Sequence, residues 1–305
     1  MTDIVLECRG VCHGFGPKNV LHNVSFRIAA GQIVALVGPS GCGKSTLLRA
    51  ILGTHLPREG EIVANGRRVT RPSRDVGIVY QNYSLYEFLT ARDNVAFGPM
   101  LDQTGLLGRC FQPFRWQRLR RRHREEAAQM LAKMNLSGAE HQYPGQMSGG
   151  MRQRVSVAQS LIMQPQILLL DEPFGALDEA VREGMQTILL QLYQENAQAI
   201  KQARRPPYTI LIVTHELNEA LYVSDRVLGL SQFHAGGAHG ATIVYDKAAP
   251  VFHPNDPRDF AQLVDQREEL RRVVFDPQSV AQHDEYVSYW SDLQAVPGSQ
   301  AAAPP

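Results

Sequence analysis

The chain has 305 residues, of which 44% are apolar and 20% are charged, and its formal net charge is +1. These values are ordinary for a globular protein, and the length is sufficient for one large domain or two small ones. A net charge this small excludes a global attraction to nucleic acid or to an anionic membrane, so any such attraction must come from a local cluster.

No stretch of the sequence reaches the roughly 18 uninterrupted apolar residues that a membrane-spanning helix needs. The first ten residues include Asp3 and Glu7 and lack the basic and apolar segments of a signal peptide. We therefore expect a soluble, cytoplasmic chain whose membrane role comes through a partner. The cysteines match no common zinc or redox spacing and are expected to be free thiols; they are Cys8, Cys12, Cys42 and Cys110.

The N-terminal part of the chain is predicted to be rich in β-structure. Residues 4–6 are a short apolar run, and residues 20–28 alternate roughly as a strand does. Residues 33–37 form a continuous apolar run, which is typical of a strand buried on both faces of a parallel sheet. A glycine-rich loop follows, and residues 46–52 are predicted to form a helix that ends at Gly53.

Two more buried strands are predicted at residues 167–170 and 209–213, and strands that alternate with helices indicate a mostly parallel α/β sheet. Residues 82–165 are polar and mostly helical in pattern, which predicts a helical subdomain inserted into this core. Beyond Ser231 the pattern weakens. A loop is expected at 234–240, a charged helix at 256–275 and a disordered low-complexity tail at 298–305.

The glycine-rich loop matches the phosphate-binding pattern G-x-x-x-x-G-K-[ST], with a strand before it and a helix after it. Glycines let backbone N–H groups approach phosphate oxygens, and the helix adds its positive N-terminal end. Lys44 supplies a point charge for the terminal phosphates, and Ser45 offers a hydroxyl to Mg²⁺. Cys42 is interpreted as a small residue that fits the loop, with a redox switch as the alternative. The predicted nucleotide contacts here are Gly38, Pro39, Ser40, Gly41, Cys42, Gly43, Lys44, Ser45 and Thr46.

Two adjacent carboxylates follow the buried run at 167–170. Asp171, at the strand end, is predicted to hold the Mg²⁺ shell, and Glu172 is predicted to point the other way because strand side chains alternate. A carboxylate beside the γ-phosphate can orient and deprotonate a water molecule. Alone the pair is weak evidence, because a polar turn after a strand is common; with the phosphate loop it indicates ATP hydrolysis.

Three further segments carry a resemblance to a known family: residues 148–154 (SGGMRQR), 171–178 (DEPFGALD) and 214–216 (THE). Together with the phosphate loop, and in this order and spacing, they make the chain resemble the ATP-binding subunit of ABC transporters from about residue 4 to about residue 250. The fold class implied is α/β, a P-loop NTPase core with a mostly parallel sheet, an N-terminal antiparallel β portion and the inserted helical subdomain. Residues 251–305 would be a C-terminal helix and tail.

The resemblance implies a role for each matching residue. Phe15 would stack on adenine, Gln81 would sense Mg²⁺ and water, and Glu172 would be the general base. His215 would contact the γ-phosphate, although a capping or core histidine is the other interpretation. The metal set would be Ser45, Gln81 and Asp171. Asp178 would belong to a loop that crosses a dimer interface, and Ser148, Gly149 and Gly150 would cap the γ-phosphate that the other subunit holds, since a helix start of this composition is an anion site.

The implied cofactors are ATP and Mg²⁺, and the implied assembly is a homodimer or a pair with a paralogous ATPase subunit. The dimer would drive an integral membrane permease from the cytoplasmic face of the inner membrane, with a periplasmic or surface solute-binding protein as an indirect partner. No nucleic-acid partner is expected. DEPF and GALD, with residues 93–98 (DNVAFG), resemble importers, in particular the nitrate, sulfonate and taurine group. Residues 85–90 (LYEFLT) depart from that group.

Residues 109–124 hold seven arginines interleaved with aromatic residues. A solvated helix face is the plainer interpretation, and contact with a permease or with anionic lipid headgroups is the alternative. Two rival functions stay open. One is lipid extraction or export, against which DEPF argues by resemblance. The other is an ABC ATPase without a permease, which usually shows two ATPase units or a long coiled-coil insertion, neither of which this chain has.

Overall fold

The computed structural model describes residues 3–103, 113–175, 177–232, 240–256 and 260–276. Cys110, the first part of the arginine-rich stretch, most of the predicted loop at 234–240 and the tail at 298–305 lie outside these residues. Cys8, Cys12 and Cys42 are free thiols, as predicted.

The central sheet has six strands in the order β10-β9-β3-β8-β7-β6. All neighbours pair in parallel except β10, which is antiparallel to β9, so the prediction of a mostly parallel sheet is confirmed. The apolar run of β3 is completely buried because the sheet is covered on both faces. The strands are β3 (Ile33–Val37), β6 (Val76–Val79), β7 (Ile167–Asp171), β8 (Ile210–Thr214), β9 (Arg226–Ser231) and β10 (Thr242–Ala248).

A second, antiparallel sheet in the order β2-β1-β4-β5 forms the N-terminal β portion. Its strands are β1 (Ile4–Phe15), β2 (Lys18–Ala29), β4 (Glu59–Ala64) and β5 (Arg67–Arg68). One continuous apolar cluster joins its inner face to one face of the central sheet and to helix α1 (Lys44–Leu52). The phosphate loop therefore begins at the centre of the molecule, between two packed sheets.

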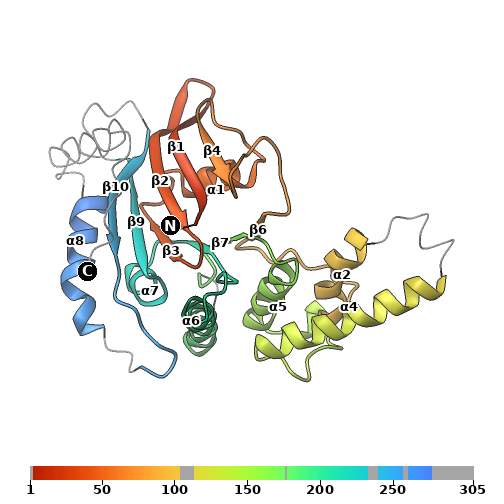
Figure 1. The fold of residues 1–305 in the computed structure, drawn as a ribbon. Coiled ribbons are helices and arrows are strands. Elements are labelled where there is room, and N and C mark those ends of the chain that lie inside the picture. Colours follow the sequence, from red (N-terminus) through yellow and green to blue (C-terminus); the bar gives the residue numbers. More distant parts are fainter. Residues whose placement is uncertain (1–2, 104–112, 176, 233–239, 257–259, 277–305) are drawn as a thin grey trace.

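The other face of the central sheet packs against α6 (Glu179–Lys201) and α7 (Leu217–Val223). Figure 1 shows a second lobe beside the sheets, which contains α2 (Ala91–Gln103), α4 (Pro113–Lys133) and α5 (Gly149–Leu161). A short 3₁₀ turn at Pro144–Gln146 precedes α5. Within the described ranges, no helix combines the length and the apolar character that crossing a membrane requires.

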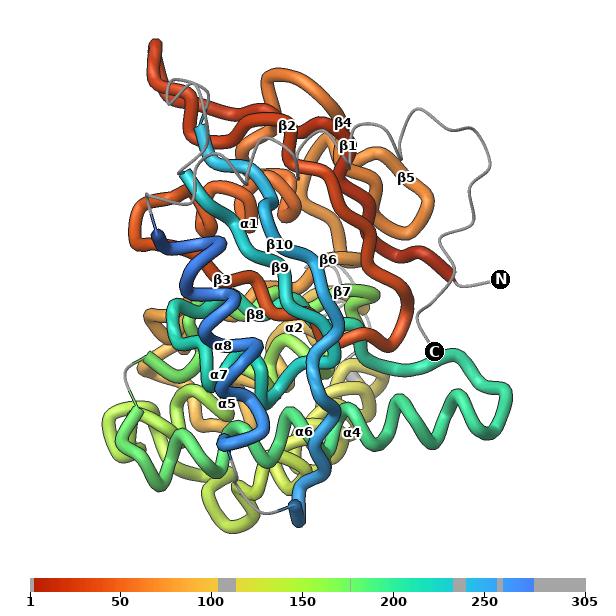
Figure 2. Tube along the Cα trace, turned by 90° about the vertical axis from the view of Figure 1, so that its left-hand side faces the viewer, coloured from red at the N-terminus to blue at the C-terminus, as the bar shows by residue number. Residues whose placement is uncertain are grey.

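The described part of the chain ends in a 3₁₀ turn (Ala261–Leu263), α8 (Val264–Leu270) and a π-helical turn (Arg271–Phe275). Figure 2 shows this segment lying along β9 and α7. Leu263, Leu270 and Val274 are fully buried in the core that the sheet shares with α6 and α7. A Cβ on Gly229 of β9 would lie 2.4 Å from Val274 Cγ2, so the glycine permits this close approach.

Candidate functional site

The phosphate loop connects the end of β3 to α1 and is held tightly against its surroundings. A Cβ on Gly38 would lie 2.3 Å from the carbonyl oxygen of Leu230, so only glycine fits there. Gly43, which caps α1, has φ +114° and lies against Val20 and Leu21. Both glycines are therefore required by the backbone path, and a glycine-rich loop of this kind lets backbone N–H groups approach an anion closely.

Lys44 is buried, and its ammonium group lies over the loop. Nζ donates to the carbonyl oxygens of Gly38 (2.7 Å) and Pro39 (2.9 Å). An ammonium group has three N–H donors, so one remains for a phosphate oxygen. The Cys42 side chain is also buried, and burial raises the pKa of its thiol. A protonated, buried thiol favours the packing interpretation of Cys42 over the redox switch.

Asp171 and Glu172 have different partners, as predicted, but strand alternation is not the reason. β7 ends at Asp171, and Glu172 leaves the strand with φ +48°, in the left-handed region. Asp171 accepts a hydrogen bond from the Ser45 hydroxyl, and burial together with the Glu172 charge raises its pKa. Glu172 Oε1 instead lies 3.3 Å from His215 Nδ1.

Gln81, which follows β6, lies near Glu172. A Cβ built on Gly175 would lie 3.5 Å from Glu172 Oε2 and 3.7 Å from Gln81 Nε2, so both groups border the same small space. The structure thus brings Glu172, Gln81 and His215 together beside Asp171 and Ser45. These residues come from the ends of β6, β7 and β8 and from α1, and parallel neighbours place their ends at one edge.

A metal ion at this edge would be held by oxygen donors. The Ser45 hydroxyl and the Asp171 carboxylate already touch, and a cation would offset the raised pKa of Asp171. Among the described residues, no cluster of three His, Cys, Asp or Glu side chains is arranged to hold a metal. Hydroxyl, carboxylate and phosphate oxygens with water suit Mg²⁺, which binds through one or two protein groups and the substrate.

Phe15 lies at the end of β1 in a cluster of aromatic rings. Half of its surface is exposed, whereas His13 is 8% exposed. The ring centroids of His13 and His55 are 5.3 Å and 6.3 Å from that of Phe15. Phe15 is therefore a half-exposed ring that packs against the rings of His13 and His55. His55 carries no signal in the sequence, and only the fold brings it next to Phe15 and His13.

The segment Ser148–Gly150 lies in the second lobe, at the start of α5. Ser148 caps this helix, and its Oγ accepts from the Met151 N–H at 3.2 Å. A Cβ on Gly150 would lie 1.8 Å from Val181 Cγ1 of α6, so the glycine is needed for this contact. Figures 1 and 2 both show α5 well apart from α1. One chain therefore does not bring Ser148 to its own phosphate loop.

Asp178 caps α6, and its Oδ1 accepts from the Val181 N–H at 2.9 Å. One turn further along α6, the Arg182 backbone N–H donates to the Asp178 carbonyl at 2.9 Å. Arg182 of α6 pairs with the buried Glu219 of α7, with Nε and Oε1 3.3 Å apart. No sequence signal marks this pair, because its members are far apart in the chain and belong to different helices.

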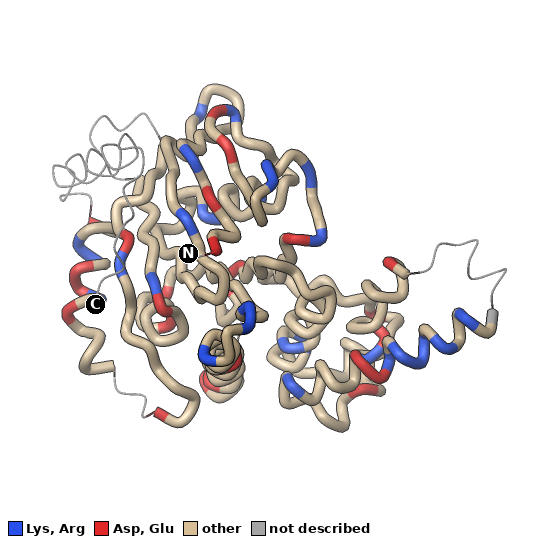
Figure 3. The backbone as a smooth tube through the Cα atoms, in the orientation of Figure 1, with Lys and Arg blue, Asp and Glu red and all other residues tan. Residues whose placement is uncertain are grey.

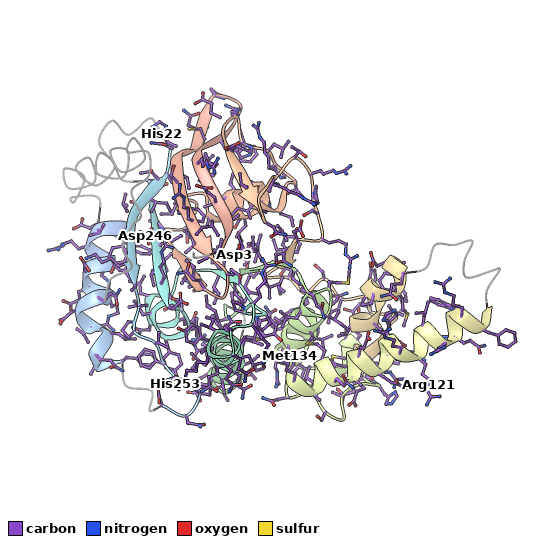
Figure 4. All side chains as sticks on the ribbon, in the orientation of Figure 1. Asp3, His22, Arg121, Met134, Asp246 and His253 are labelled. Carbon is purple, nitrogen blue, oxygen red and sulfur yellow. The ribbon has the colours of Figure 1, made fainter. Side chains whose placement is uncertain are left out.

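Three arginines of α4 form ion pairs within their own lobe. Arg124 binds Asp93 of α2 through two contacts of 2.6 and 2.7 Å, and Arg121 and Arg122 pair with glutamates one turn later. Figure 3 shows the basic positions along α4, and Figure 4 places Arg121 on its outer part. Among the described residues, Arg118 and Arg120 have no ion-pair partner.

Comparison with known proteins gives one consistent result. The family model described as ABC transporter matches residues 21–175. The chain is 37% identical to the taurine import ATP-binding protein TauB of Escherichia coli, over 90% of this chain and 91% of the relative. It is 38% identical to the sulfate/thiosulfate import ATP-binding protein CysA of Brucella melitensis, over 81% of this chain and 63% of that longer protein.

Two solved structures resemble the fold. One is the dimeric post-hydrolysis state of the ATP-binding cassette MJ0796 bound to ADP and Pi, with TM-score 0.61, 26% identity and coverage of 81% of this chain and all of that one. The other is cbiO1 from Clostridium perfringens, part of the transporter complex cbiONQ. Its TM-score is 0.66 over 96% of this chain and all of that one; at 19% identity it supports the fold alone.

Proposed function

The chain belongs to the ABC transporter family, and we propose that it is the ATP-hydrolysing subunit of an importer, working as a dimer on a membrane permease. The observation that carries the catalytic assignment is the contact of 3.3 Å between Glu172 and His215, beside Asp171 and Ser45 at the end of the phosphate loop. A base, a γ-phosphate contact and a metal shell are the parts that phosphoryl transfer to water requires.

The residues of the site divide the work of binding and hydrolysis in this mechanism. Backbone N–H groups of residues 40–46 and the Lys44 ammonium bind the phosphates, while the adenine stacks on Phe15. Ser45 and Asp171, with Gln81, would hold Mg²⁺, which neutralises charge on the phosphates when bound. Glu172 accepts a proton from the attacking water, and His215 orients Glu172 and contacts the γ-phosphate.

Dimer formation follows from the separation of the two anion sites in one chain. Ser148–Gly150 opens a helix with free N–H groups, yet it lies in another lobe from the phosphate loop. A second copy, placed head to tail, would bring its own segment over the γ-phosphate, and Asp178 would lie at that interface. ATP then holds the two subunits together, and hydrolysis releases them, which moves a permease bound to both.

The transported solute is proposed to be a small anion or sulfonate such as nitrate or taurine, since relatives named for taurine and sulfate import share most of this chain. The permease would be an integral membrane protein, fed by a periplasmic or surface solute-binding protein. The chain would sit on the cytoplasmic face of the inner membrane, held there by its partner.

The test of this function compares the wild-type chain with Lys44→Ala in ATP hydrolysis and nucleotide binding. We expect Mg²⁺-dependent turnover in the wild type and its loss, with weaker ATP binding, in Lys44→Ala, because the charge at the phosphates is gone. Lys201→Ala, at the exposed C-terminal end of α6, is the matched control and keeps full activity. Wild-type turnover in Lys44→Ala would overturn the site assignment. Uptake of taurine in proteoliposomes that contain the chain and its permease tests the solute class.

A further inference from the structure

Two loops of the site are joined by a side-chain network that the mechanism above does not use. One loop precedes α6 and carries Asp178, and the other follows β8 and carries His215. The loops meet through Arg182 near the start of α6 and Glu219 of α7. Arg182 lies in the first turn of α6, which directly follows the Asp178 loop, and Glu219 lies in the first turn of α7, which directly follows the His215 loop. Each side chain can therefore contact the loop that precedes its helix.

The His215 side of the network fixes the residues on both sides of the histidine. The Thr214 hydroxyl donates to Glu219 Oε2 at 3.3 Å and accepts from the Glu216 N–H at 3.1 Å. Glu219 is 8% exposed, so this contact is shielded from water. The hydrogen bond from the Glu216 N–H to the Thr214 hydroxyl spans residue 215 and restricts its backbone. The Glu219 carboxylate in turn fixes the position of the Thr214 hydroxyl.

The Asp178 side of the network is held by the same guanidinium. Arg182 Nη2 donates to the carbonyl oxygen of Leu177 at 3.3 Å. Separately, the backbone N–H of Arg182 donates to the carbonyl oxygen of Asp178 at 2.9 Å. Its Nε lies 3.3 Å from Glu219 Oε1. The guanidinium therefore touches the loop before Asp178 and the carboxylate that anchors Thr214 at the same time.

The ionised state of Glu219 depends on the positive charge of Arg182. Burial raises the pKa of Glu219, whereas the Arg182 charge and the Thr214 hydrogen bond lower it. Without Arg182, the buried carboxylate would have no described counter-ion in contact with it and would tend to take up a proton. The hydrogen bond from Thr214 to Glu219 would then change, although Thr214 is in β8 and the lost residue is in α6.

We propose that Arg182 and Glu219 are positioning residues that couple the loop carrying Asp178 to the turn carrying His215. Movement of the Asp178 loop when two subunits meet is passed through the pair to His215, and so to Glu172 at 3.3 Å. This inference rests on the proposed function, in which Asp178 lies at the dimer interface and His215 contacts the γ-phosphate. Neither residue of the pair touches the nucleotide.

The experiment measures kcat and KM for MgATP, and the Kd of ATP, in the full chain with Arg182→Gln, Glu219→Gln and both together. We expect each single change to lower kcat about 10-fold or more, while the Kd of ATP stays within about 2-fold. The double variant should be no slower than the slower single variant, because the residues act as a unit. Arg182→Lys, which keeps the charge, should recover part of kcat.

Glu195→Gln is the matched control, since Glu195 also pairs across helices from α6, with Lys133 at 2.6 Å, but more than ten residues from the loops. It should leave kcat unchanged. Wild-type kcat in both single variants, losses that multiply in the double variant, or an equal loss in Glu195→Gln would each overturn the coupling. If Arg182→Gln does not fold, Arg182→Lys with Glu219→Gln decides the same question. If the coupling is overturned while Lys44→Ala is still inactive, the proposed function stands. If the wild-type chain shows no turnover, the coupling and the proposed function are both overturned.

Discussion

Residue 172 shows how a single backbone conformation separates two adjacent acids. A left-handed conformation costs a non-glycine residue about 1–2 kcal/mol, and Glu172 adopts it with φ +48°. The turn is held by the Glu172 N–H, which donates to the Val213 carbonyl at 2.9 Å, and by the Gly175 N–H, which donates to the Glu172 carbonyl at 3.3 Å. As a result the carboxylate faces His215 and leaves Asp171 to Ser45.

Phe15→Ala removes the exposed ring on which a base would stack. We expect ATP affinity to fall by roughly 1–3 kcal/mol, the usual worth of one stacked base. Phe15→Tyr is the conservative control and should bind normally. Titration of both variants with ATP checks this, and unchanged affinity in Phe15→Ala would move the adenine contact to another ring of the cluster, such as His13.

Asp225, just ahead of β9, makes stability depend on pH. Burial raises its pKa to about 7; Oδ2 accepts from the Ile33 N–H, while Oδ1 has no hydrogen-bond partner among the described residues. The folded chain therefore keeps this proton up to about pH 7, whereas the unfolded chain loses it near pH 4. Folding takes up a proton between these values, so the free energy of unfolding decreases as pH rises from about 4 to 7.

Asp225→Asn mimics the neutral carboxyl and should remove this pH dependence. We expect the variant to be more stable than the wild type above pH 7, by up to about 4 kcal/mol, and the difference to shrink as the pH falls toward 4. Urea unfolding at pH 5, 6, 7 and 8 measures the trend, with the exposed Glu87→Gln as control. A difference that does not change with pH would show that Asp225 stays ionised in the folded chain.

Helix α4 shows why a basic stretch is not by itself a binding surface. Of its arginines, Arg124 joins α4 to α2 through Asp93, and the Arg124 guanidinium helps to hold the pKa of that carboxyl below its usual range. Arg121 and Arg122 pair along the helix, where such contacts contribute little. The solvated-face interpretation thus fits Arg121 and Arg122, and a contact surface is left to Arg118, Arg120 and the exposed Phe114.

Arg118→Gln with Arg120→Gln should leave ATP hydrolysis by the isolated chain unchanged and weaken its association with permease-containing membranes at low salt. The control, Arg67→Gln with Arg68→Gln, removes the same charge from the exposed strand β5. Sedimentation of the chain with membranes at two salt concentrations measures the effect, because surface charge contacts are screened by salt. Equal retention of both double variants would favour the solvated face for the whole helix.

The whole molecule consists of a sheet lobe with the phosphate loop and a helical lobe with Ser148–Gly150, and one chain keeps these anion sites apart. The C-terminal turn and α8 belong to the sheet lobe, because their apolar side chains complete its core. In the proposed mechanism a second chain closes the active site, so the oligomeric state is the measurement that tests this mechanism most directly.

Glu172→Gln separates binding from chemistry at this scale. Gln keeps the shape and can hydrogen bond to the attacking water, but it cannot accept the proton. ATP should still bind, hydrolysis should stop, and the contact across the dimer should persist. We expect a shift from monomer to dimer with MgATP, measured by size-exclusion chromatography with light scattering, alone and with the permease.

Adding Ser148→Arg places bulk and charge in the closed interface and should abolish that dimer. Thr187→Arg, in the middle of α6 and away from the proposed interface, is the control and should still dimerise. Hydrolysis by Glu172→Gln at the wild-type rate would remove the catalytic role of Glu172. An ATP-dependent dimer that survives Ser148→Arg would place the interface elsewhere.

The sequence by itself determined the local elements and their chemistry. The apolar run of β3, the loop from Gly38 to Ser45 and the helix that ends at Gly53 are encoded within a few residues, and the structure places them as predicted. Short-range preferences of glycine, of buried strands and of helix ends suffice for this.

Only the tertiary structure decided which of these pieces meet. Glu172 reaches His215 because β7 and β8 are neighbours in register, with Asp171 opposite Val213, and no local pattern states that order. The same holds for the pairs Arg182–Glu219 and Arg124–Asp93, and for the packing of Val274 on Gly229. Such contacts depend on how whole helices and strands pack together, which is cooperative. The order of residue types along the chain does not specify this packing locally.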